Sequence, residues 1–391
     1  MSLKINRSQS VTFPHSPVRN EVRPEVHSAH LISVDLWESA TGEKTTPLEL
    51  YSILENNLLT AFSTPLMIEQ MKIRNLSRDR NECRTIQMEL QDGDQNRRNV
   101  IFNAIRDNIV EFVYDQYANY VIQKMCEVAD NEQCSVILEA IKSDMQTMTE
   151  NQNGCRVLQK FVERASPPLV DNLFISLKPY FIPMCYSLNG NRIIQDIITK
   201  IPDRLPEIIE LIQPHVFSLV VDNCGCRVVQ HIFSNPTLRS LEPLIVEVMK
   251  RGNELALNQY GNYVVQNILE SGSADQVSCL IEKFKGYYYS FSIHKFASNV
   301  IEKCIRNASN DEKNEIFNEI IYDGESQDER IRTMIGDRFG NYVIQRVLEY
   351  GTKDQQYAIY QTLNKYYDEL SEINFSRHVI LRLKSMGYSF K

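Results

Sequence analysis

The segment FGNYVIQ at residues 339–345 is one of eight related segments that decide the fold of this 391-residue chain. The other seven, in chain order, are NECRTIQ (81–87), YANYVIQ (117–123), NGCRVLQ (153–159), NGNRIIQ (189–195), CGCRVVQ (224–230), YGNYVVQ (260–266) and FASNVIE (296–302). Their last residues are separated by 36, 36, 36, 35, 36, 36 and 43 residues. A fixed period of this length is the signature of a repeat architecture.

Each unit has room for two longer helices and a short one, and no strand-like alternation separates them. Stacked helical units bury their apolar faces against their neighbours, so the sequence predicts an all-α fold of the solenoid type. Residues 48–75 and 365–391 resemble degenerate units, and we expect them to cap the array. Residues 1–47 are rich in Ser, Pro and charged residues. This composition predicts a largely disordered segment, with Trp37 as a local anchor.

Composition narrows the functional classes. No apolar run reaches the ~18–20 residues that span a bilayer, and the first residues lack the apolar stretch of a signal peptide, so we expect a soluble, cytoplasmic protein. The nine cysteines and seven histidines do not cluster at ligand spacing. We therefore expect no metal, no cofactor and no enzymatic activity. The formal net charge of −8 argues, at first sight, against a nucleic-acid partner.

The chemistry of one unit is visible on a helical wheel. At 100° per residue, Val121 and Ile122 fall on an apolar face, whereas Asn119 and Gln123 lie one turn apart beside Tyr120. Amide and carboxylate side chains at this spacing can pair with the edge of a nucleobase, and Tyr or Arg can stack on its face. Eight such sites in a row predict single-stranded RNA as the ligand.

These motifs resemble the PUF (Pumilio) family of RNA-binding proteins, over residues 48–391. The resemblance implies a right-handed, crescent-shaped solenoid of eight repeats that reads one base per repeat. The residues expected to contact base edges are Cys83 with Gln87, Asn119 with Gln123, Cys155 with Gln159, Asn191 with Gln195, Cys226 with Gln230, Asn262 with Gln266, Ser298 with Glu302, and Asn341 with Gln345. The residues expected to stack on bases are Arg84, Tyr120, Arg156, Arg192, Arg227, Tyr263, Asn299 and Tyr342.

By the same resemblance, the RNA runs antiparallel to the protein. Pairs of Asn and Gln should read U, pairs of Cys and Gln should read A, and Ser298 with Glu302 should read G. The predicted element is 5′-UGUAUAUA-3′. The implied role is repression or decay of messenger RNA through elements in the 3′ untranslated region.

Two other classes remain as alternatives: a helical-repeat protein scaffold of HEAT or armadillo type, and a PUF-like ribosome-biogenesis factor. The expected protein is a monomer. The 43-residue spacing marks an insertion at residues 322–334, and its acidic segment DGESQDE (323–329) predicts a solvated loop. By resemblance, this loop is a place where co-repressors or deadenylase machinery could bind.

The charge is unevenly distributed. The eight six-residue windows that begin at residues 83, 119, 155, 191, 226, 262, 298 and 341 contain eight basic and two acidic residues, a net charge of +6, so the rest of the chain carries −14. The sequence therefore predicts a basic stripe on the reading face of an acidic molecule.

Overall fold

The computed structural model describes residues 64–234, 241–322 and 327–390. The chain divides into two compact units, Met1–Ile68 and Glu69–Lys391, of which the second holds all eight repeats. The segment expected to be disordered, residues 1–47 with Trp37, lies outside the described residues. In the part that is described, the backbone forms α-helices and short 3-10 turns, and no strand occurs. The predicted all-α class is confirmed.

Each repeat contains a helix that carries the repeated segment and a further helix on the opposite side, and each repeat from the second onward begins with a short helix. The short helices are α6 (Ile109–Tyr114), α9 (Met145–Glu150), α12 (Phe181–Tyr186), α15 (Val216–Val220), α18 (Gly252–Leu257), α21 (Tyr288–Ser292) and α24 (Gln327–Gly336). The helices with the repeated segment, called inner helices below, are α4 (Cys83–Asp92), α7 (Ala118–Val128), α10 (Gln152–Arg164), α13 (Gly190–Lys200), α16 (Gly225–Phe233), α19 (Gly261–Ser271), α22 (Ala297–Asn307) and α25 (Gly340–Tyr350). The outer helices are α5 (Gln95–Ile105), α8 (Asn131–Lys142), α11 (Pro167–Leu177), α14 (Leu205–Ile212), α17 (Glu242–Lys250), α20 (Ala274–Lys283), α23 (Asn310–Ile321) and α26 (Lys353–Lys365).

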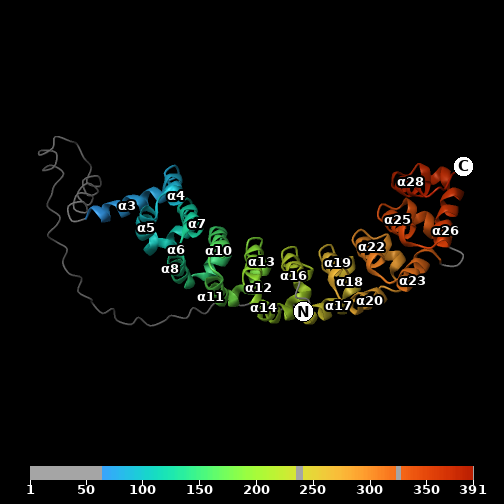
Figure 1. Ribbon diagram of the computed structural model, residues 1–391, viewed down its shortest axis with the longest axis horizontal. Coiled ribbons are helices and arrows are strands. Elements are labelled where there is room, and N and C mark those ends of the chain that lie inside the picture. The colour runs from blue at the N-terminus through green and yellow to red at the C-terminus, as the bar shows by residue number, and fades with distance from the viewer. Residues whose placement is uncertain (1–63, 235–240, 323–326, 391) are drawn as a thin grey trace, which may run out of the picture. The chain divides into compact units, whose positions relative to one another are not determined.

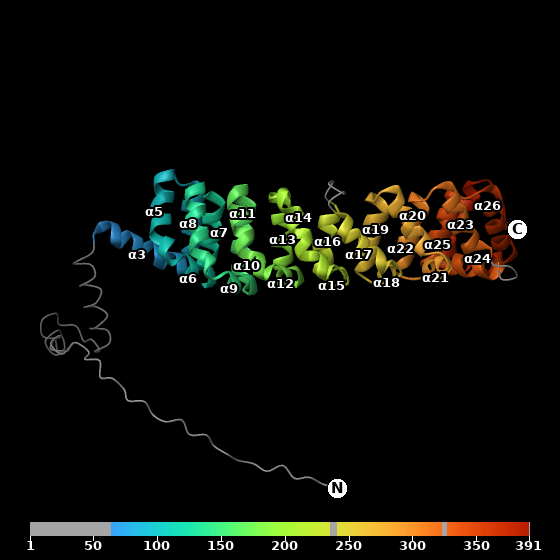
Figure 2. The same ribbon diagram turned by 90° about the horizontal axis from the view of Figure 1, so that it is seen from below.

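The inner helices form one continuous row within the second unit. Each contacts the inner helix of the next repeat, from α4 with α7 through α22 with α25. Figure 1 shows this row along the concave side of the arched unit, with the outer helices on the convex side, and Figure 2 shows the same row from below. The predicted crescent-shaped α-solenoid is confirmed. Its concave face consists of the surfaces of the inner helices.

The two ends of the array carry additional helices. Helix α3 (Pro65–Arg78) precedes the first repeat. At the other end, α27 (Tyr367–Ser371) is followed by α28 (Arg377–Ser385), which contacts α25 as a further inner helix would. Five 3-10 turns complete the described structure: η1 (Arg106–Asn108), η2 (Lys178–Tyr180), η3 (Pro202–Arg204), η4 (Gln213–His215) and η7 (Asn374–Ser376).

The core follows the apolar positions of the repeated segment. Val157, Leu158, Val264 and Val265 are fully buried, as the helical wheel predicts. They belong to one hydrophobic cluster that is continuous along the described array. Because each repeat buries its apolar face only against its neighbours, the inner helices are held at a regular spacing. The polar side chains beside the core therefore recur at the same places along the concave face.

A glycine before the repeated reading residues permits close contact between the short and inner helices. A Cβ atom on Gly154 would lie 2.6 Å from the carbonyl oxygen of Met148, and one on Gly190 would lie 2.7 Å from that of Met184. No side chain fits at such distances without a shift of the backbone. The small residue thus sets how tightly the short helix supports the reading helix.

The insertion before the eighth repeat differs from its prediction. We expected a loop over residues 322–334, whereas residues Gln327–Gly336 form helix α24. Ile331, Met334 and Ile335 are fully buried, because their spacing of three and four residues forms an apolar stripe that packs into the core. The sequence-based prediction of a loop rested on the acidic residues at the start of the segment and did not take this stripe into account. Residues 323–326 lie outside the described residues.

Candidate nucleic-acid interface

Each inner helix presents a five-residue reading segment, numbered here as positions one to five. The segments are residues 83–87, 119–123, 155–159, 191–195, 226–230, 262–266, 298–302 and 341–345. In all eight repeats the side chain at position one is buried, that at position two is exposed and that at position five is half-buried. Tyr263, for example, is 53% exposed, whereas Asn262 before it is 1% exposed. The three predicted contact positions therefore occupy three distinct environments.

The sequence predicted that both amides of an Asn/Gln pair face the ligand, but the structure buries the asparagine. Nδ2 of Asn119 donates to the backbone carbonyls of Asp115 (2.7 Å) and Gln116 (3.0 Å), and its Oδ1 accepts from Nε2 of Gln123 at 2.9 Å. Asn191 and Asn262 make the same three bonds in their repeats. Asn341 makes the equivalent bonds to Asp337 and Gln345. The asparagine thus fixes the orientation of the glutamine.

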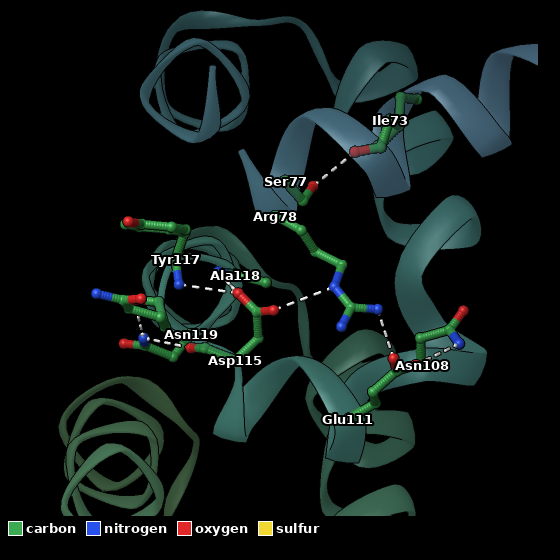
Figure 3. A network of polar contacts seen from close by, with 10 residues as sticks. Ile73, Ser77, Arg78, Asn108, Glu111, Asp115, Tyr117, Ala118 and Asn119 are labelled. Carbon is green, nitrogen blue, oxygen red and sulfur yellow. Dashed lines mark hydrogen bonds and ion pairs between the residues drawn. The ribbon is translucent and has the colours of Figure 1, made fainter. Parts of the chain in front are cut away.

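A turn before each reading segment holds the asparagine in place. Asp115 accepts the backbone N–H groups of Tyr117 (2.8 Å) and Ala118 (2.9 Å) through Oδ1, while its backbone carbonyl accepts from Asn119. Figure 3 shows this network, in which Arg78 of α3 also contacts Asp115 at 3.1 Å. An acceptor side chain stands at the same place in every repeat, namely Asp79, Asp115, Asn151, Ser187, Asp222, Asn258, His294 and Asp337. The sequence carries a signal for this capping position, because a side chain that can accept a hydrogen bond stands four residues before position one in every repeat. The sequence-based prediction did not include it.

The cysteines at position one are buried, neutral thiols. Sγ of Cys155 lies 3.2 Å from the carbonyl oxygen of Thr149, and burial raises its pKa to about 11. Burial also raises the pKa of Cys83 and of Cys226. At neutral pH these thiols therefore act as small, weakly polar groups. Among the described residues, their glutamines donate no side-chain hydrogen bond to the side chain at position one, whereas Gln123 and its counterparts in the Asn repeats donate to the asparagine Oδ1.

A Pumilio-family RNA-binding repeat model matches residues 108–142, 147–176, 215–249, 253–283, 287–321 and 330–363, just over half of the chain. The chain belongs to the PUF family. Its repeats are therefore of the RNA-binding type. The reading segments at 83–87 and 191–195 lie outside the match, yet their inner helices α4 and α13 contact their neighbours in the same row. The family match favours RNA binding over the HEAT or armadillo scaffold.

Curated relatives agree with this assignment. Pumilio homolog 12 of Arabidopsis thaliana is 28% identical over 283 residues, which are 71% of this chain and 47% of the relative. Fem-3 mRNA-binding factor 2 of Caenorhabditis elegans is 33% identical over 157 residues, which are 34% of this chain and 25% of the relative. The chain thus spans half or less of the length of these relatives, and the similarity concerns their PUF repeats.

Solved PUF structures share the fold. The crystal structure of PUF-8 in complex with PBE-RNA has 26% identity and a TM-score of 0.72, and the match covers 87% of this chain and 100% of that chain. The Puf3 RNA-binding domain bound to a recognition sequence from the Cox17 RNA 3′ UTR has 29% identity and a TM-score of 0.67, with 84% and 96% covered. The predicted family is confirmed, together with RNA as the partner.

The predicted basic stripe of this PUF domain is largely paired. The residue after the reading segment, position six, is a cation in four repeats, and each of these cations contacts a carboxylate. Lys124 lies 2.6 Å from Glu127, and Lys160 lies 2.9 Å from Glu163 and 3.3 Å from Glu127. Lys303 pairs with Glu270, and Arg346 pairs with Glu302 and Glu349. The six-residue windows used to predict a net charge of +6 end just before most of these carboxylates, so the predicted charge omitted them. Among the described residues, three of the four arginines at position two, Arg84, Arg156 and Arg227, make no ion pair.

The concave face of the PUF domain is hollowed over the fourth to sixth repeats. A cavity of about 820 Å³ is lined by side chains of α13, α16 and α19, among them Arg192, Arg227 and Tyr263 at position two. Asp196 stands at position six of the fourth repeat, where four other repeats carry a cation. Its Oδ1 lies 3.3 Å from Nε of Arg192, and burial raises the pKa of its carboxyl group. The cation is therefore replaced by an acid beside this hollow.

Neither a membrane-spanning helix nor a metal-binding cluster occurs in the described part of the PUF chain. Within residues 64–234, 241–322 and 327–390, no helix has the length and apolar character needed to cross a membrane. In the same residues, no three His, Cys, Asp or Glu side chains are arranged to hold a metal ion.

Proposed function

We propose that this PUF protein binds a single-stranded element of the type 5′-UGUAUAUA-3′ in messenger RNA, with one base at each repeat. The single observation that carries the proposal is the eightfold recurrence of one arrangement: a buried position one, an exposed position two and a half-buried position five on neighbouring helices. An exposed planar side chain beside a polar group that is held in place suits a base that is stacked on its face and contacted at its edge.

The hydrogen bonds of the Asn repeats support uracil as their base. One N–H of Gln123 is used by Asn119, so its amide has a second N–H and its Oε1 to offer. These two groups match O4 and N3–H of uracil. The same reasoning applies to Gln195, Gln266 and Gln345. In this proposal the asparagine acts by orienting the glutamine, because both of its own N–H groups are used by the backbone in three of these repeats.

The remaining repeats are proposed to read purines. Gln87, Gln159 and Gln230 can each donate to N1 and accept from the amino group of adenine, while the thiol at position one makes an apolar contact. Glu302 is the sole acid at position five. A carboxylate accepts from the two adjacent N–H groups of guanine, which no amide can do, so we assign guanine to the seventh repeat.

The biological role is proposed from the relatives. Puf3 was solved with a 3′ UTR recognition sequence, and two relatives from Caenorhabditis elegans are named as mRNA-binding factors. By analogy, we propose that this protein acts on 3′ untranslated regions in the cytoplasm, as a monomer, and represses translation or promotes decay. Co-repressors or deadenylases are the proposed protein partners.

Binding of labelled RNA, followed by fluorescence anisotropy, tests the assignment. RNA that carries UGUAUAUA should bind tightly, and replacement of its G by U should weaken binding by about 1–3 kcal/mol, the value of one good bidentate base contact. Equal binding of the two RNAs would show that the assignment is wrong. Weak preference at every position would instead favour the ribosome-biogenesis alternative.

A further inference from the structure

Neighbouring inner helices are joined by contacts beside the reading segments, between position six of one repeat and position nine of the preceding repeat. Nζ of Lys124 lies 3.2 Å from Oε1 of Gln91, and Lys303 pairs with Glu270. Nε2 of His231 lies 2.9 Å from Oγ1 of Thr199. In these pairs the partner at position nine lies one turn beyond the reading residue. The contacts join the repeats without involving a base-reading side chain.

The last of these contacts is different. Position nine of the seventh repeat is Arg306, which has the same charge as Arg346 at position six of the eighth repeat. Because the two cations repel, Arg346 does not pair with position nine. Its Nε instead lies 3.2 Å from Oε2 of Glu302, at position five, and a second guanidinium nitrogen pairs with Glu349. Arg346 therefore contacts Glu302, which is the one acidic residue at position five in the eight repeats.

Glu302 depends on this contact for its orientation. In the Asn repeats, position five is held by the asparagine of the same repeat, as Gln123 is by Asn119. Among the described residues, no hydrogen bond joins Ser298 to Glu302, and the fixed partner of the Glu302 carboxylate is Arg346. Both side chains are about three-quarters buried, with 23% of Glu302 and 26% of Arg346 exposed. Of the two carboxylate oxygens, only Oε2 is used by Arg346, so acceptor sites remain for a base.

We propose that Arg346 of the eighth repeat is a positioning residue that holds the Glu302 carboxylate toward the base of the seventh repeat and thereby sets its preference for guanine. This inference rests on the assignment of guanine to Glu302. A glutamate that is free to rotate could turn into solvent when another base is bound and avoid the cost of an unmatched carboxylate. The ion pair with Arg346 prevents this rotation. Arg346 also pairs the charge that the base would otherwise bury alone.

The test compares Arg346→Gln with native protein by titrating two RNAs, UGUAUAUA and its variant with U in place of G. We expect the ratio of the two Kd values to fall by about fivefold, the scale of the ordering cost of one rotamer-rich side chain. Arg346→Lys should retain most of the ratio, because lysine occupies position six in three other repeats and still offers a cation. Substitution of the first U, at the repeat of Asn341 and Gln345, should cost the same in all these proteins.

Lys303→Gln is the matched control. It also removes one cation from position six, but its partner Glu270 reads no base. It should leave the G-to-U ratio unchanged, and thermal melts of each variant report on folding. If native protein shows no preference for G, the proposed function fails. If native protein prefers G and Arg346→Gln keeps the full ratio, the role of Arg346 is wrong while the proposed function stands.

Discussion

At the residue scale, the orientation of the glutamines at position five in the Asn repeats depends on buried asparagines at position one. Asn119 and Asn262 are each 1% exposed and have their amides bonded to preceding carbonyls. Buried polar groups of this kind stabilise a structure only when their hydrogen bonds are made, so the position is restricted to residues that complete the turn. In the proposed mode of binding, the glutamine that contacts the base and the asparagine that fixes the orientation of this glutamine are therefore distinct.

A double substitution tests the roles of positions one and five. Ser298→Asn with Glu302→Gln should change the preference at the second base from G to U, because the introduced asparagine finds the carbonyls of His294 and Lys295 where other repeats offer theirs. The expected gain for U over G is about tenfold or more, the value of one matched base contact. Competition between the two labelled RNAs measures it. Retention of the G preference would contradict the assignment.

At the element scale, the short helix fixes where the reading helix begins. A Cβ atom on Gly154 would meet both the carbonyl oxygen and the Cα of Met148, at 2.6 and 2.8 Å. Two other repeats carry alanine at this place, Ala118 and Ala297, and both are fully buried. The allowed residue is therefore small in every repeat from the second onward, since the helices cannot approach otherwise.

Gly154→Val should destabilise the domain by about 1–3 kcal/mol, the usual cost of overpacking a dense interior. The added methyl groups would separate α9 from α10 and shift the third reading segment. Denaturant unfolding measures the stability loss. Ala118→Gly serves as the comparison, with an expected cost of about 1–2 kcal/mol from backbone entropy and the loss of one buried methyl group, and without a shift of the short helix. A valine variant as stable as native protein would contradict the close-contact account.

At the scale of the whole domain, the row of reading segments carries little unpaired positive charge. Position-six cations are paired with carboxylates, and Arg192 is paired with Asp196. Among the described residues, Arg84, Arg156 and Arg227 at position two make no ion pair. Affinity should therefore arise mainly from stacking and base edges, with a small contribution from phosphate neutralisation.

The salt dependence of RNA binding measures this balance. Each phosphate neutralised on a single strand contributes about −0.7 to the slope of log K against log salt concentration, so about three free arginines predict a slope near −2. Arg156→Gln should reduce this slope, whereas Lys160→Gln should leave it nearly unchanged, since Lys160 is held by Glu127 and Glu163. A slope as steep as about −6 would show that the paired cations also neutralise phosphates.

The local sequence pattern was sufficient to predict much of the fold of this protein. The 36-residue period and the apolar positions predicted the stacked helices, because each repeat packs only against the repeats that precede and follow it in the chain. The acidic start of the insertion was misleading, since the buried stripe of Ile331, Met334 and Ile335 outweighs it. The sequence by itself determined the helical array and the residue types on its concave face. Only the tertiary structure decided that asparagine is buried and that Arg346 pairs with Glu302, because these outcomes depend on the distances between helices.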